Sequence, residues 1–172
     1  ANGAEPVGIQ VALLLPEGTT DGFIGKLMAD MDAACAELGI EILGGHTEVT
    51  SQVKGPLVVT TALGRAPRNR YVTSSGTRAG DIIYVTKGAG LEGTGILASD
   101  HREALTPETD MLLLERASRF LDQISVVPEA MAAASAGASA MHDITEGGFY
   151  GALWEVLSAS SCGCEIQIAD VP

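Results

Sequence analysis

The chain's first group of potentially reactive residues reads His142-Asp143-Ile144-Thr145-Glu146-Gly147-Gly148. Thr145 is expected to cap a following helix, whose first backbone N–H groups the glycines leave uncovered by side chains. Those N–H groups and the positive end of the helix dipole favour phosphate or carboxylate. The alternative is that Asp143 and Thr145 only cap the helix and the glycines only allow close packing. This motif alone does not decide between them.

The second group reads Gly44-Gly45-His46-Thr47-Glu48 and is expected to end a strand. Open sheets usually keep their ligand-binding groups at such ends. A carboxylate and an imidazole can hold Mg²⁺-bound water or phosphate oxygens, and a hard cation prefers the carboxylate. The alternative is a tight Gly-Gly turn with a solvent-facing histidine.

Four motifs, taken in order, resemble the aminoimidazole ribonucleotide (AIR) synthase superfamily. They are Gly3-Ala4-Glu5-Pro6, Gly44 to Glu48, Ala79 to Asp81, and His142 to Gly148. This superfamily also contains thiamine-monophosphate kinase, selenophosphate synthetase and HypE. The resemblance extends over nearly the whole chain. It implies a mixed α/β (α+β) fold with two domains, and a homodimer that binds ATP and Mg²⁺ at its interface.

The resemblance also assigns roles to individual residues. It places Gly44, Gly45, His46 and Thr47 against the nucleotide, with His46 and Glu48 near the metal. Thr145, Gly147 and Gly148 would line the substrate cleft, and Asp143 and Glu48 would be catalytic.

The chain departs from the family pattern at its start. Family members carry an Asn-Asp pair, whose Asp is a metal ligand, before the Gly-Ala-Glu-Pro motif, but only Asn2 precedes Gly3 here. We therefore interpret the chain as an internal fragment that is inactive alone. His46 stands where thiamine-monophosphate kinases have Asp, AIR synthases have Glu and selenophosphate synthetases have His. The subfamily stays open.

The domain organisation is expected to follow the same pattern. Residues 1–64 would form a partial N-terminal ATP-binding domain, 65–79 a linker, and 80–172 a partial C-terminal domain. The stretch from Val49 to Gly80 has basic but no acidic residues, which suits a solvated linker better than a phosphate-binding rim. Long apolar runs in strands 7–15 and 57–63 predict that both sheet faces are covered, the second by another subunit.

The remaining elements follow from periodicity and capping residues. Helices are predicted from Thr20 to Gly39, from Thr106 onward and over 128–136. Further strands are predicted over 40–43, 81–86 and 165–168. The Gly-x-Gly-x-x-Gly run from Gly88 to Gly93 is interpreted as a turn, because no second strand ending in an acid follows it.

Composition excludes several classes of function. The 172 residues carry a net charge of −12, which argues against nucleic-acid and anionic-membrane partners. No apolar run is long enough to span a bilayer, and three cysteines without a signal peptide favour the cytoplasm. Cys35 is expected in the core, and Cys162 and Cys164 as free thiols. A small-molecule substrate and a second copy of the chain remain as partners.

The function that suits these motifs is ATP-dependent phosphoryl transfer to, or activation of, a small molecule by a HypE-like protein. Thiamine-monophosphate kinase and selenophosphate synthetase are alternatives of similar chemistry. A non-catalytic ligand-binding or assembly module is an alternative of another class.

Overall fold

The structure, a computed structural model, describes residues 1–172. The chain forms two compact units. The strand unit comprises Ala4–Asn69, and the helical unit comprises Ala1–Gly3 together with Arg70–Pro172. The strand unit therefore carries the Gly44–Glu48 motif, and the helical unit carries the His142–Gly148 motif.

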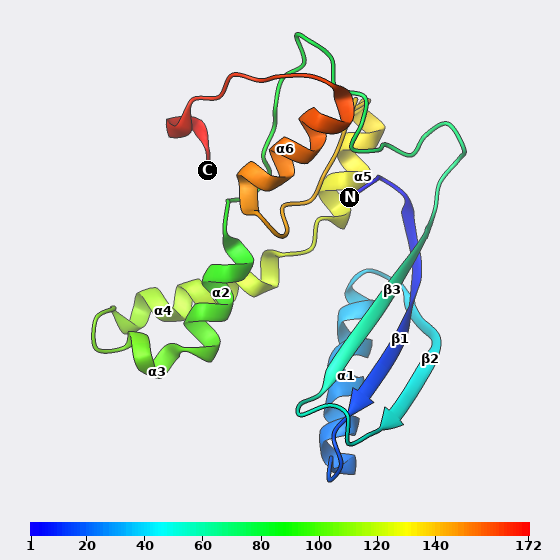
Figure 1. The fold of residues 1–172 in the computed structure, drawn as a ribbon, viewed down its shortest axis with the longest axis vertical. Helices are drawn as coiled ribbons and strands as arrows, with labels where there is room; N and C mark the ends of the chain where they lie inside the picture. Colours follow the sequence, from blue (N-terminus) through cyan, green and yellow to red (C-terminus); the bar gives the residue numbers. More distant parts are fainter. The chain divides into compact units, whose positions relative to one another are not determined.

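The strand unit contains β1 (Glu5–Leu15), α1 (Asp21–Glu37), β2 (Glu41–Val49) and β3 (Leu57–Arg65) (Figure 1). β1 lies in the middle of the sheet, parallel to β2 and antiparallel to β3. A parallel pair needs a crossover connection, which α1 provides. The Thr20 hydroxyl accepts a hydrogen bond from the N–H of Phe23, which confirms the predicted cap.

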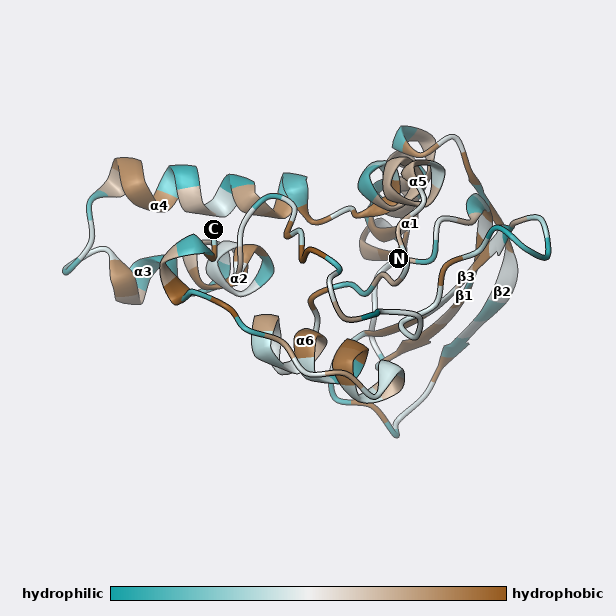
Figure 2. Ribbon diagram, turned by 90° about the horizontal axis from the view of Figure 1, so that it is seen from above, coloured by the Kyte–Doolittle hydropathy of each residue, from teal (hydrophilic) through white to brown (hydrophobic).

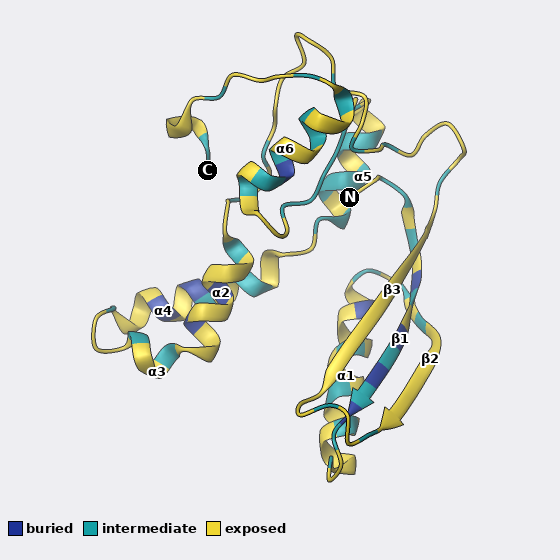
Figure 3. Cartoon of the chain, in the orientation of Figure 1, coloured by how far each residue is buried: buried dark blue, intermediate teal, exposed yellow.

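The helix α1 covers one face of this sheet. Val11, Leu13 and Leu15 of β1 are buried on that face (Figure 3), where they pack against apolar side chains that include Ile24, Leu27 and Met31. Side chains alternate along a strand, so the residues of β1 between these three point to the other side of the sheet. Residues that pair with them on β2 and β3 lie on that same side. We call that side the open face; it carries Ala12, Leu14, His46, Glu48, Leu57, Val59 and Leu63.

The helical unit has a small core between its first helices. It contains α2 (Leu91–Asp100), α3 (Arg102–Leu105) and α4 (Met111–Ser118), which continues into the 3-10 helix η1 (Arg119–Gln123). Ala98, Leu114 and Ala117 are buried there, with Leu105 packed against them. α4 begins with hydrophobic residues and continues with hydrophilic ones (Figure 2), and only Leu114 and Ala117 of this helix are buried.

The rest of the helical unit is formed by α5 (Val127–Ala136), α6 (Gly148–Ser160) and the 3-10 helix η2 (Ile168–Asp170). α5 confirms the helix predicted over 128–136, with a proline in its first turn. Cys35 is buried in α1, as predicted, and all three cysteines are free thiols. No helix combines the length and apolar character that crossing a bilayer requires.

Three predicted elements are wrong. Residues 81–86 and 165–168 form no strand, because no neighbouring strand offers them hydrogen-bonding partners; Ile82 and Tyr84 are exposed. The helix predicted from Thr106 begins instead at Met111, where the Asp110 carboxylate accepts from the N–H of Leu112. The Thr106 hydroxyl donates to the carbonyl of Arg102, behind it in the chain.

Candidate functional site

The Gly44–Glu48 motif forms the last part of β2, at the end of a strand as predicted, but the strand predicted over 40–43 extends to Val49 and the glycines make no turn. β2 continues to Val49 because its backbone pairs with β1 along this whole stretch. Side chains alternate along a strand, so His46 and Glu48 share the open face while Thr47 lies on the α1 side. The structure therefore brings two of the three predicted polar side chains together.

The His46 and Glu48 side chains form a solvated pair. Nε2 of His46 lies 3.6 Å from Oε2 of Glu48, and the side chains are 71% and 58% exposed. This open position leaves both groups accessible to a ligand. It also means that the pair adds little to stability.

The two glycines of this motif have a structural explanation. Gly44 and Gly45 have φ angles of +147° and +155°, where other residues are strained. A Cβ at Gly45 would lie 1.7 Å from the carbonyl oxygen of Val11 in β1. Only glycine permits this approach of β2 to β1, next to a register shift in their pairing. The predicted nucleotide contacts of these glycines stay predictions.

The donor set at His46 and Glu48 suits a metal carried by a nucleotide better than a metal held by protein alone. No cluster of three or more His, Cys, Asp or Glu side chains that could hold a metal is present. Mg²⁺ commonly binds one or two carboxylates and completes its coordination with phosphate oxygens and water. Glu48 offers one such exposed carboxylate.

The second motif leads into α6, which begins at Gly148 with Gly147 as its N-cap. Thr145 was predicted to cap this helix, but no side chain caps it; instead the N–H of Gly148 donates to the Thr145 carbonyl at 3.1 Å. Gly147 and Gly148 have φ angles of +79° and +60°. The positive φ at both positions explains the glycines, and the absence of a side-chain cap leaves N–H groups of the first turn available to a ligand.

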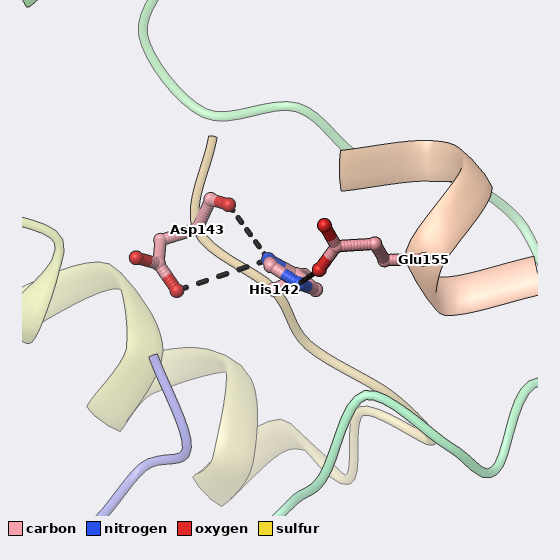
Figure 4. A network of polar contacts seen from close by, with 3 residues as sticks. All are labelled: His142, Asp143 and Glu155. Carbon is pink, nitrogen blue, oxygen red and sulfur yellow. Dashed lines mark hydrogen bonds and ion pairs between the residues drawn. The ribbon is translucent and has the colours of Figure 1, made fainter. Parts of the chain in front are cut away.

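His142 is the most constrained side chain of this motif (Figure 4). Its Nδ1 lies 2.7 Å from the backbone carbonyl oxygen of Asp143, and its Nε2 lies 2.6 Å from Oε2 of Glu155 on α6. The ring is 18% exposed. Burial lowers the pKa of His142, but the Asp143 carbonyl and the Glu155 carboxylate outweigh this effect and raise the pKa above its ordinary value.

Asp143 and His142 also line a cavity of about 360 Å³ within the helical unit. The Asp143 carboxylate is 45% exposed and lies 3.8 Å from Nδ1 of His142. The glycines of the motif and Thr145 are not among the lining residues. The cavity is lined by Ala1, Asn2, Tyr71, Val72, Thr73, Ser74, Met141, His142 and Asp143.

Residues 71–77, predicted to lie in the linker, also contribute to this part of the helical unit. The N–H of Met141 donates to the Thr73 carbonyl, and the hydroxyl of Ser160 accepts from the N–H groups of Gly76 and Thr77. These bonds join distant parts of the chain, so no local pattern signals them. The nearby Ala79–Asp81 motif is held similarly, with the Ser139 hydroxyl and the Arg78 N–H donating to Asp81, which lowers its pKa.

Comparison with known proteins identifies the family. Residues 1–66 match the N-terminal domain of the AIR synthase related proteins, and residues 78–172 match the C-terminal domain. The chain belongs to the AIR synthase-related family. This membership confirms the resemblance drawn from the four ordered motifs.

Individual relatives agree with this assignment. The chain is 28% identical to carbamoyl dehydratase HypE of Rhodobacter capsulatus over 99% of its own length and 48% of that protein. It is similar to the crystal structure of E. coli HypE, with a TM-score of 0.82 and 25% identity over 99% of this chain and 51% of that one. The structure of AaThiL complexed with AMPPCP and TMP shares the fold, with a TM-score of 0.76 and 22% identity over 94% of this chain and 49% of that one.

The chain spans about half the length of the curated relatives it matches. The mixed α/β fold predicted from sequence is therefore confirmed over about half of the AIR synthase-like domain pair.

Proposed function

We propose that the whole protein binds ATP together with Mg²⁺ and transfers a phosphoryl group to, or otherwise activates, a small-molecule substrate. The observation that carries this proposal is the match of both AIR synthase-related domains along the chain. The similarity to HypE over 99% of the chain favours a HypE-like reaction. The fold shared with an AMPPCP complex, whose ligand is an analogue of ATP, supports nucleotide binding.

Each unit contributes residues suited to one part of this chemistry. In the strand unit, Glu48 would supply a hard oxygen to Mg²⁺, while His46 and the backbone of Gly44, Gly45 and Thr47 would contact phosphate oxygens. Bound Mg²⁺ neutralises the charge that develops on the transferred phosphoryl group.

In the helical unit, Asp143 would orient the substrate at the cavity that it lines. Thr145, Gly147 and Gly148 would present the uncapped start of α6 to an anionic group of the substrate.

Calorimetric titration tests the nucleotide part of this proposal. The protein expressed from its complete reading frame should bind ATP with Mg²⁺ present and lose most of that affinity in EDTA. Replacing Glu48→Gln should weaken binding about tenfold or more, because a charged metal ligand is lost. Glu37→Gln at the end of α1 is the matched control and should leave affinity unchanged. Absence of binding heat with Mg-ATP would contradict the proposal.

A kinase acting on a phosphorylated vitamin precursor is the second candidate, because the AaThiL complex that shares this fold holds TMP beside AMPPCP. Selenophosphate synthesis is a further alternative. ATP consumption measured with a panel of acceptors separates these reactions. Mg-ATP binding without turnover for any acceptor would instead favour a ligand-binding or assembly module.

We also propose that the protein is a homodimer. The open face of the strand unit exposes Leu57, Val59 and Leu63 by 48%, 52% and 41%. Burial of such side chains in a second subunit is favourable by about 1.5–3 kcal/mol for each fully buried residue.

A further inference from the structure

The hydrogen bonds of His142 define which ring atoms carry protons. A backbone carbonyl oxygen can only accept, so Nδ1 donates to Asp143. The second acceptor is a carboxylate oxygen of Glu155, 2.6 Å away, so Nε2 donates as well. Both ring nitrogens therefore hold a proton, and the ring is an imidazolium.

This protonation state argues against a role for His142 as a general acid or base. A general acid or base needs a ring nitrogen directed toward its substrate, but both nitrogens here are directed to protein acceptors. The two acceptors belong to different parts of the chain. Asp143 lies in the segment that precedes α6, and Glu155 lies near the middle of α6 itself. A single ring therefore joins the segment to the helix.

We propose that His142 is a positioning residue whose ring, donating from both nitrogens, fixes the Asp143 segment against α6. This proposal deepens the proposed function, because it rests on Asp143 acting at the cavity. It adds a pH limit: when the ring loses one proton, it can no longer donate to both partners. The Asp143 segment should then lose the hydrogen bond from the His142 ring to Glu155, which attaches it to α6.

The groups around the ring define the expected direction of the effect. Asp143 on the ring's own segment and Glu155 on α6 both favour the imidazolium. Residues 1–2 and 71–74 line the same cavity, and Tyr71 is the titratable side chain among them. Burial of the ring lowers the pKa of His142, but the hydrogen bonds to the Asp143 carbonyl and the Glu155 carboxylate together outweigh it. The titration midpoint of His142 should therefore lie above 6.5, the ordinary value for histidine. The segment should stay fixed at pH values below this midpoint and loosen at pH values above it.

NMR of the 172-residue chain tests this proposal without nucleotide or substrate. The chain has three histidines, so ring ¹⁵N signals of His142 can be assigned against the exposed His46 and His101. We expect imidazolium shifts at both ring nitrogens near neutral pH and a His142 titration midpoint above 6.5, the ordinary value for histidine. Backbone amides of Asp143 and Ile144 should change with the same midpoint.

The variant Glu155→Gln separates charge from hydrogen bonding, because the amide oxygen can still accept from Nε2. We expect the His142 midpoint and the amide transition at Asp143 to move together to lower pH. Glu115→Gln on α4 removes the same charge from an exposed pair with Arg119 and should move neither.

Several outcomes would overturn the proposal. They are a His142 titration midpoint at or below 6.5, a neutral ring with one tautomer near neutral pH, or Asp143 amides that do not follow the ring. The wild-type titration alone decides these points if Glu155→Gln does not fold. Failure of Mg-ATP binding would reject the proposed function and leave this result standing.

Discussion

At the scale of single residues, glycines in the two motifs have conformations that other residues adopt only with strain. Gly45 sits against the Val11 carbonyl, and Gly147 forms the start of α6 in a left-handed conformation. The family resemblance placed Gly45 against the nucleotide, and the sequence suggested an anion at the backbone beside Gly147, with a tight turn and close packing as the alternatives. The structure supplies a backbone reason for each, and this reason is compatible with a ligand but does not require one.

Substitution of Gly45 should reveal how strongly strand pairing depends on it. Gly45→Ala places a Cβ where the Val11 carbonyl lies, so β2 must move away from β1. We expect a loss of about 3 kcal/mol in the free energy of unfolding. Gly44→Ala is the matched control, because Gly44 has a similar φ but open space around its Cβ position. Its expected loss is about 1 kcal/mol.

Urea denaturation of the two variants and the wild type measures this difference. Equal losses for both variants would show that the positive φ alone, rather than contact with β1, requires the glycines.

At the scale of elements, the sequence predicted those parts whose signals are local. The apolar run of β1, the cap and periodicity of α1, and the proline start of α5 all have local causes, and the structure contains these elements. The strand predicted over 81–86 failed because a strand needs a neighbour, which a run of Ile and Tyr does not supply. The end of β2 was predicted too early because its two glycines resemble a turn. Pairing with β1, which lies far away in sequence, continues the strand through them.

Helix capping provides a direct test at this scale. Thr20 and Thr145 were both predicted as N-caps, but only the Thr20 hydroxyl accepts a backbone N–H. Thr20→Ala should therefore lower the free energy of unfolding by about 1 kcal/mol. Thr145→Ala should change it by less than about 0.5 kcal/mol, because this exposed residue contributes only its carbonyl to the start of α6.

Thermal and urea unfolding monitored by circular dichroism distinguishes these two expectations. A loss at Thr145 as large as that at Thr20 would show that its hydroxyl stabilises α6 after all. In the complete protein, Thr145→Ala is expected to reduce activity instead, through the substrate cleft proposed at α6.

At the scale of the whole molecule, the order of four short motifs predicted the family although none of them was decisive alone. Nothing local in the sequence indicated that His142 bonds to Glu155, 13 positions along the chain. Cavity residues such as Tyr71 and Thr73 carried no signal, because long-range hydrogen bonds bring their segment to Met141. The family was thus easier to predict than the residues that surround each motif.

The apolar open face leads to the prediction about assembly. Leu57, Val59 and Leu63 are exposed on β3, on the face that α1 does not cover. A second subunit would bury them, so light scattering should report a dimer at micromolar concentration. Val59→Asp should shift the protein to monomer, because its charge would lose water at the interface. Ser51→Asp, in the turn after β2, adds the same charge away from this face and should leave the dimer intact. A wild-type monomer, or a dimer that survives Val59→Asp with its circular dichroism unchanged, would reject the open face as the subunit interface.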